Sequence, residues 1–177
     1  VRIRAGINRK QLLSFSQSEK SVNALIIAGS YTQKTTRQIE ELSRNARLLK
    51  TEILLNRIFT DSKVYENELI NLVDQGLASG QNVLLITERK LMDFGSDDEN
   101  QVRAQEISLF ISRIIEGLGS YPGVIISKGG ITSHDVMKHG LGIRQAEVLG
   151  QIEPGVPLLK ISSGDKYMQN PTDGLQN

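Results

Sequence analysis

The residues best suited to binding a ligand lie between Gly123 and Asp135, where a lysine and two glycines follow an apolar run. This order is typical of a buried strand, a glycine turn and a helix start. Adjacent glycines let the backbone approach a ligand closely, and a helix start offers unpaired N–H groups and a positive dipole end. Lys128 adds a charge, while Thr132 and Ser133 add hydroxyl groups. The stretch predicts a site for a nucleotide or sugar phosphate. A purely structural turn is the alternative, because Thr132-x-x-Asp135 also fits a helix capping box.

A second anion-binding corner is indicated near the beginning of the chain. The apolar residues 25–28 read as a strand, Gly29-Ser30 as a turn, and Gln33 to Leu48 as a helix with one apolar stripe. Lys34-Thr35 follows the glycine, but the spacing is one residue short of a phosphate loop and the second glycine is missing. We therefore reject that motif. Ser30 stands at the strand end and is the residue of this corner best placed to reach a ligand.

The elements that must position these corners alternate between strands and helices with a period of about thirty residues. The pattern predicts strands at Leu25–Ala28, Ile53–Leu55, Val83–Ile86, Val124–Ile126, Gln145–Gln151 and Leu158–Ile161, and helices at Gln33–Leu48, Lys63–Ser79, Gln101–Leu118 and Ser133–His139. We expect an α/β fold, a three-layer α/β/α domain with a mainly parallel sheet. Ligands of such sheets bind at the carboxyl ends of the strands.

Three further features could suggest chemistry but favour structural interpretations. The carboxylates at 97–99 form an acidic loop before a predicted helix, and they lack the alternating spacing of a calcium loop. His139 falls in the last turn of a helix, where a cation stabilises the dipole. His134 lies beside the glycines and could approach a ligand, but an exposed histidine at a helix start is the interpretation that we favour. The sequence assigns no metal ligand and no catalytic residue.

Composition limits the classes of protein to consider. The chain has 177 residues, 38% of them hydrophobic and 23% charged, with a net charge of +1. It has no cysteine, which excludes disulfides and thiolate chemistry, and no apolar run long enough for a membrane span. Eight aromatic residues and a near-neutral charge do not indicate nucleic-acid binding. We expect a cytoplasmic protein; homo-oligomer formation is left open.

The domain organisation is expected to be simple. Residues 1–20 read as a linker or the end of a preceding domain, residues 21–161 as one α/β domain, and residues 162–177 as a polar tail. The first residue is Val1, so we interpret the chain as a piece of a longer protein.

Four motifs occur in an order and spacing that resemble a known family. They are G-S-x-T-x-x-T-x-x-Q at 29–38, K-G-G-I-T-S-x-D at 128–135, L-G-I-R at 141–144 and G-Q-I-x-P-G-V-P at 150–157. Together, over about residues 22–161, they resemble the C-terminal, nucleotide-binding domain of the four-carbon acid sugar kinases.

The resemblance implies an ATP-dependent kinase of acids such as threonate, erythronate or 3-oxo-tetronate, with the acid held by an upstream domain. It implies ATP and Mg²⁺ as cofactors. The residues it places at the nucleotide, together with those argued from the turn, are Ser30, Lys128, Gly129, Gly130, Ile131, Thr132, Ser133 and Gly155. This chain alone is expected to be inactive, because it offers no general base.

Two departures from the family pattern are visible. Ile131 stands where an acidic residue is commoner, and the usual glycine-containing closing segment is not recognisable after Ile161. A non-catalytic nucleotide- or phosphosugar-binding module is the alternative function, and an interaction domain with purely structural glycines is a third.

Overall fold

The computed structural model describes residues 22–29, 32–89, 95–153 and 155–161. Within them the chain divides into two compact units, one spanning Val22–Gly142 and the other containing the segment that begins at Ile143. The first unit has a four-stranded sheet with strand order β2-β3-β1-β4, and all three neighbouring pairs are parallel. The strands are β1 Ala24–Ala28, β2 Leu48–Ile53, β3 Asn82–Thr87 and β4 Val124–Lys128.

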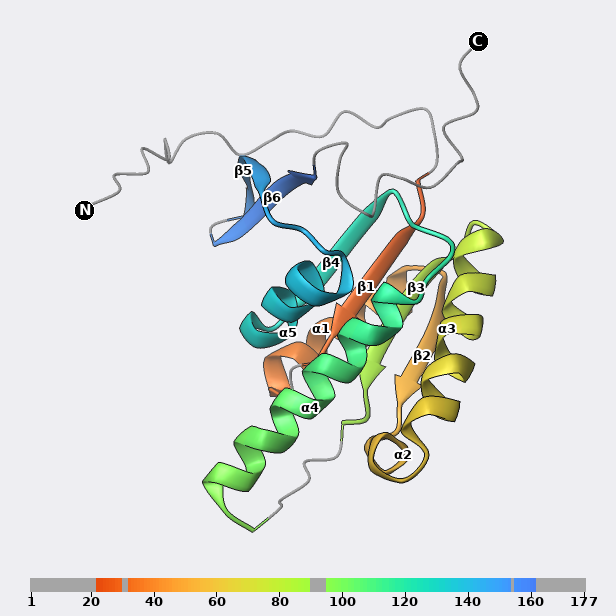
Figure 1. Cartoon of the computed structure of the whole chain (residues 1–177). Helices are drawn as coiled ribbons and strands as arrows, with labels where there is room; N and C mark the ends of the chain where they lie inside the picture. Colours follow the sequence, from red (N-terminus) through yellow and green to blue (C-terminus); the bar gives the residue numbers. More distant parts are fainter. Residues whose placement is uncertain (1–21, 30–31, 90–94, 154, 162–177) are drawn as a thin grey trace, which may run out of the picture. The chain divides into compact units, whose positions relative to one another are not determined.

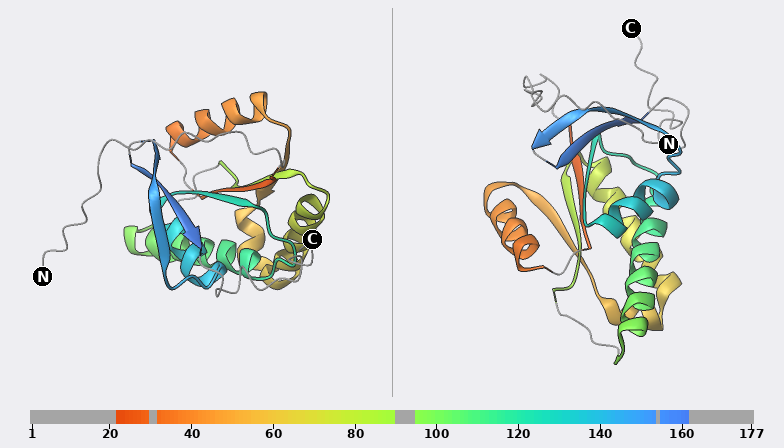
Figure 2. Two further views of the ribbon diagram at one scale, coloured as in Figure 1. Left: turned by 90° about the horizontal axis from the view of Figure 1, so that it is seen from above. Right: turned by 90° about the vertical axis from the view of Figure 1, so that its left-hand side faces the viewer.

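Helices cover both faces of this sheet (Figure 1). They are α1 Gln33–Asn45, α2 Leu55–Thr60, α3 Ser62–Ala78, α4 Asp97–Glu116 and α5 Gly130–Asp135, and α5 continues as the π-helix η1 Val136–Gly140. Figure 2 shows α1 alone on one face and α3, α4 and α5 on the other. The predicted three-layer α/β/α architecture is confirmed.

The core follows from the two faces of the sheet. Ala28, Leu84 and Ile86 pack with Ile39 of α1 on one side. On the other side, α4 buries its apolar stripe, which includes the fully enclosed Phe110. The central strand β3 is buried at every position after Asn82, as expected for a parallel strand covered on both faces.

Two predicted boundaries near β2 are wrong. The expected strand at Ile53–Leu55 begins earlier, at Leu48, and ends at Ile53. The expected helix at Gln33–Leu48 ends earlier, at Asn45, because the apolar residues after it belong to β2. As an edge strand, β2 alternates buried Thr51 and Ile53 with exposed charged residues, so it lacks the continuous apolar run of a central strand.

The acidic loop before α4 is also corrected. The helix begins at Asp97, and Asp97, Asp98 and Glu99 form its first turn. Ser96 caps it, because its hydroxyl accepts a hydrogen bond from the Glu99 N–H at 3.3 Å. The carboxylates therefore stabilise the positive end of the helix dipole, the structural interpretation favoured from sequence.

The second compact unit contains a β-hairpin. Strands β5 Ala146–Glu153 and β6 Val156–Ile161 pair antiparallel in a separate two-stranded sheet. Both strands were predicted, but they pair with each other and do not extend the parallel sheet. Gly155 lies at the hairpin turn with φ of +85°, a conformation that favours glycine.

Candidate functional site

The two corners singled out from the sequence lie at neighbouring strand ends. Strands β1 and β4 run parallel, with Ala28 opposite Lys128, so the turns that follow them leave the sheet side by side. The carboxyl ends of adjacent parallel strands are where ligands bind in open α/β sheets. Ser30 lies outside the described residues, whereas its neighbour Gly29 is described.

Gly29 and Thr132 join the two corners. A Cβ atom added to Gly29 would lie 2.5 Å from Thr132 Oγ1, so only glycine lets the α5 segment approach this closely. Thr132 is only 8% exposed, and its side chain lies against Gly29 at the end of β1.

The two glycines of the turn have different roles. Gly129 has φ of +108° and ψ of 128° and precedes the first residue of α5. Its conformation is the one that requires glycine. Gly130 does not have a positive φ, and a Cβ atom added there would meet nothing within 4 Å. One glycine makes the turn, and the other leaves space beside the helix start.

The start of α5 differs from the sequence expectation. The helix begins at Gly130 and its N-cap is Gly129, which has no side chain, so Thr132-x-x-Asp135 is not a capping box. Ser133 Oγ hydrogen-bonds Ser127 Oγ at 3.1 Å, which ties the helix to β4. Gly129, the N-cap residue, has no side chain that could bond the first-turn N–H groups of α5, and such groups can bind an anion.

Arg89 is a feature of the site that sequence reasoning missed. It follows the end of β3, and its guanidinium donates to Thr36 Oγ1 from Nε at 3.2 Å and from Nη2 at 2.9 Å. Nη2 also donates to the Thr32 carbonyl at 3.4 Å. Thr32 caps α1, since its hydroxyl accepts from the Thr35 N–H. Arg89 thus fixes the start of α1 to the neighbouring strand end. A basic residue two positions after the end of a strand was the available signal.

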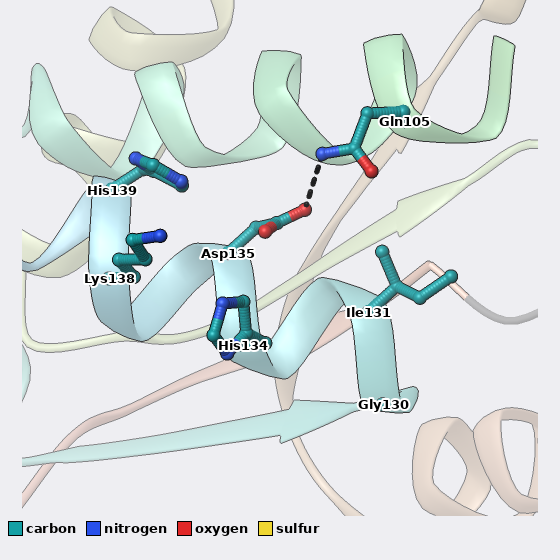
Figure 3. Close-up of a pocket in the computed structure, with 7 residues that line it drawn as sticks. All are labelled: Gln105, Gly130, Ile131, His134, Asp135, Lys138 and His139. Atoms are coloured by element: carbon teal, nitrogen blue, oxygen red, sulfur yellow. Dashed lines mark hydrogen bonds between the residues drawn. The ribbon is translucent and has the colours of Figure 1, made fainter. Parts of the chain in front are cut away.

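A groove of about 480 Å³ opens beside the glycine turn, between α4 and the α5–η1 segment. Figure 3 shows its lining side chains. They are polar or charged apart from one glycine and one isoleucine: Gln105, Gly130, Ile131, His134, Asp135, Lys138 and His139. Ile131, predicted as a nucleotide contact, is 60% exposed at this groove.

Asp135 is the buried polar group of the groove. Its side chain accepts hydrogen bonds on Oδ2 from Ser108 Oγ at 2.6 Å and from Gln105 Nε2 at 3.5 Å. The π-helix that follows packs against α4, and Gly140 is needed there because an added Cβ would lie 3.0 Å from Ile115 Cβ. The wide helical turn and close packing hold Asp135 at the floor of the groove.

The corner offers groups that suit an anionic phosphate. The open space at Gly130, the first-turn amides of α5 and the charge of Lys128 are the chemistry that such a group needs. Among the described residues, no three His, Cys, Asp or Glu side chains gather into a metal site. A magnesium ion at this corner would therefore be held chiefly by the phosphates and water, its usual manner of binding beside nucleotides.

The comparison with protein families decides the identity of the domain. Residues 25–173 match the model of the nucleotide-binding C-terminal domain. The chain belongs to this family. It is the C-terminal domain type of the four-carbon acid sugar kinases, as the four motifs predicted. None of the curated proteins compared with it matches the chain.

Two solved structures share the fold of this nucleotide-binding domain. One is a Salmonella typhimurium LT2 protein provisionally named a tRNA synthase, with a TM-score of 0.64 and 18% identity over 82% of this chain. The other is a DUF1537 protein from Bordetella bronchiseptica with bound citrate, a domain-swapped dimer, with a TM-score of 0.57 and 16% identity over 84% of this chain. The chain spans 36% and 35% of their lengths.

In the described ranges, no helix combines the length and the apolar composition that crossing a bilayer requires.

Proposed function

We propose that this chain is the nucleotide-binding part of a cytoplasmic, ATP-dependent kinase of four-carbon sugar acids such as threonate, erythronate or 3-oxo-tetronate. The observation that carries the proposal is the glycine turn after β4, with an uncapped helix start and open space at Gly130, in a chain of the nucleotide-binding family. The acid is proposed to bind to an upstream domain.

Each site residue has a proposed role. The amides that follow Gly129 bind phosphate oxygens, and Lys128 neutralises their charge. Gly29 and Thr132 hold the two corners together, and Arg89 fixes the start of α1 beside them. Ser30 is proposed to contact the nucleotide. Gly155 lies in the hairpin unit and remains a proposed contact from the family motif.

Such a site serves phosphoryl transfer by positioning. Bound ATP, with Mg²⁺, supplies the phosphoryl group, and catalysis depends mainly on alignment and on neutralising charge. A domain that only binds and orients the nucleotide is therefore sufficient for one half of the enzyme. The general base is proposed to come from the acid-binding part of the protein.

Replacing Gly130 by Val tests the space beside the helix start. The site around Gly130 is open and its φ is not positive, so the variant is expected to fold normally. The added side chain would occupy the phosphate position, and ADP binding should be lost. Isothermal titration calorimetry measures binding, and circular dichroism checks the fold.

Replacing Lys128 by Met tests the charge at the same corner. We expect ADP binding to weaken by about 1.5–3 kcal/mol, the loss of one charge-assisted contact. Lys50→Met removes an exposed lysine from β2 and is the matched control, with unchanged affinity expected. Equal ADP affinity in wild type, Gly130→Val and Lys128→Met would overturn the proposed site, and the glycines would then be structural.

A further inference from the structure

The groove between α4 and α5–η1 is not explained by phosphate binding alone. It begins at Gly130 and Ile131, which also form the helix start, and it continues along the helix past His134 and Asp135 to Lys138. Its volume of about 480 Å³ falls within the range of small-molecule sites. A nucleotide whose phosphates lie on the glycine turn has its sugar and base still to be accommodated.

We propose that this groove binds the nucleoside part of the nucleotide, with Asp135 and Gln105 hydrogen-bonding the ribose and Ile131 packing against the ribose or base. The inference rests on the proposed nucleotide-binding function, and it assigns the direction in which the ligand leaves the glycine turn. The groove lies wholly within the Val22–Gly142 unit.

The chemistry of Asp135 favours a polyhydroxyl group. A carboxylate can accept about four hydrogen bonds, and the two donors recorded for Asp135, Ser108 and Gln105, both reach Oδ2. Asp135 is 4% exposed and lines the groove, so a ligand in the groove is the group that could use its remaining acceptor capacity. Ribose hydroxyl groups are donors of the required kind, and a buried acceptor is stabilised when it is paired.

The same carboxylate argues against phosphate groups in the groove. A phosphate beside Asp135 would bring two negative charges together in a partly desolvated place, which is unfavourable. The exposed Ile131 gives an apolar surface that a ribose or base can cover and that a phosphate cannot use. His134, Lys138 and His139 are exposed at the groove rather than buried at its floor.

Gln105→Ala tests the assignment without disturbing the core, because Gln105 is exposed on α4. Binding of AMP, ADP, ATP and inorganic tripolyphosphate is measured by calorimetry. We expect the variant to weaken all three nucleotides by the same factor, about five- to twentyfold, because one polar contact is lost. Tripolyphosphate binding should be unchanged. Gln101→Ala, one turn earlier on the same helix and outside the groove, is the matched control and should change nothing.

The Lys128→Met variant gives the opposite pattern and separates the two parts of the site. Its effect should grow from AMP to ATP and should include tripolyphosphate, since it acts on phosphate charge. Unchanged nucleotide binding in Gln105→Ala, with normal binding by the wild type, would overturn the nucleoside assignment and leave the proposed function intact.

Two other outcomes also overturn the assignment. Weaker tripolyphosphate binding in Gln105→Ala would mean that the groove holds phosphates. A Gln105→Ala effect on threonate binding, without one on AMP, would mean that it holds the sugar acid. Absence of any nucleotide binding by the wild type would overturn both this inference and the proposed function.

Discussion

At the scale of single residues, the site depends on three glycines that are needed for different reasons. Gly129 supplies a backbone conformation, Gly130 supplies open space, and Gly29 permits a close approach. The roles of Gly129 and Gly130 were predictable from the sequence, because the two glycines are adjacent. The role of Gly29 was not predictable, because Thr132 is about a hundred residues away in the chain and meets Gly29 only through the pairing of β1 with β4.

The contact between Gly29 and Thr132 should be measurable as an energetic coupling. Gly29→Ala is expected to lower the free energy of unfolding by about 1–3 kcal/mol, because the new methyl group overlaps the Thr132 side chain. Thr132 is branched at Cβ and buried, so few other rotamers are open to it that would relieve the overlap. In a Thr132→Ala background the same change should cost about 0.5 kcal/mol or less, since the overlapping atoms are gone. Urea denaturation of the four proteins of this cycle gives the coupling.

Gly130→Ala is the control for that cycle. The added methyl group meets nothing within 4 Å, so stability without ligand should be nearly unchanged. Additive effects of Gly29→Ala and Thr132→Ala would contradict the contact and would leave the two corners unconnected at this point.

At the scale of secondary-structure elements, a buried carboxylate connects α3 to α4. Glu66 of α3 is 4% exposed and accepts hydrogen bonds from Lys63 Nζ at 2.6 Å and from Arg113 Nε of α4 at 2.8 Å. Burial alone would raise the pKa of Glu66, but the bonds from Lys63 and Arg113 outweigh it and hold the pKa below its ordinary value. The hydrogen bond between Glu66 and Arg113 therefore helps to hold α4 against α3, and α4 contributes a lining residue to the groove.

This arrangement predicts a stability change in acid. A carboxylate with a lowered folded-state pKa stabilises the protein above its unfolded-state pKa, and the stabilisation is lost as pH falls through the folded-state value. The window lies below about pH 4.5, the ordinary value for Glu66. In Glu66→Gln the free energy of unfolding should fall less steeply over this window than in wild type, because this group no longer titrates. Urea denaturation between pH 3 and pH 7 measures the difference. Identical slopes in the two proteins would contradict the assignment.

Some strands and helices could be predicted from the sequence, and others could not. Strands β1, β3 and β4 were predictable because continuous apolar runs mark them. The edge strand β2 alternates with charged residues, and α5 begins on two glycines with no side-chain cap, so neither boundary had a local signal. The groove beside Asp135 was not predictable either, since it depends on the packing of α4 against α5 and on the π-helical turn.

At the scale of the whole molecule, the hydrophobic core belongs to one of the two units. All buried apolar side chains in the described part of the chain lie between Leu25 and Leu141. The β5–β6 hairpin has exposed Val148, Leu149, Ile152 and Val156. An isolated two-stranded hairpin is marginally stable at best in water, whereas a four-stranded sheet covered on both faces has a core of its own.

Residues 22–142 produced alone should therefore fold. No buried apolar side chain of the described ranges is removed, so we expect one cooperative unfolding transition and a free energy of unfolding within about 1 kcal/mol of the full chain. A peptide of residues 143–161 alone should show no cooperative transition, because it buries too little apolar surface to offset its conformational entropy. Urea denaturation followed by circular dichroism measures both. Loss of cooperative unfolding in residues 22–142 would mean that the rest of the chain completes the core, and the parallel sheet could then not be regarded as an independent scaffold for the phosphate corner.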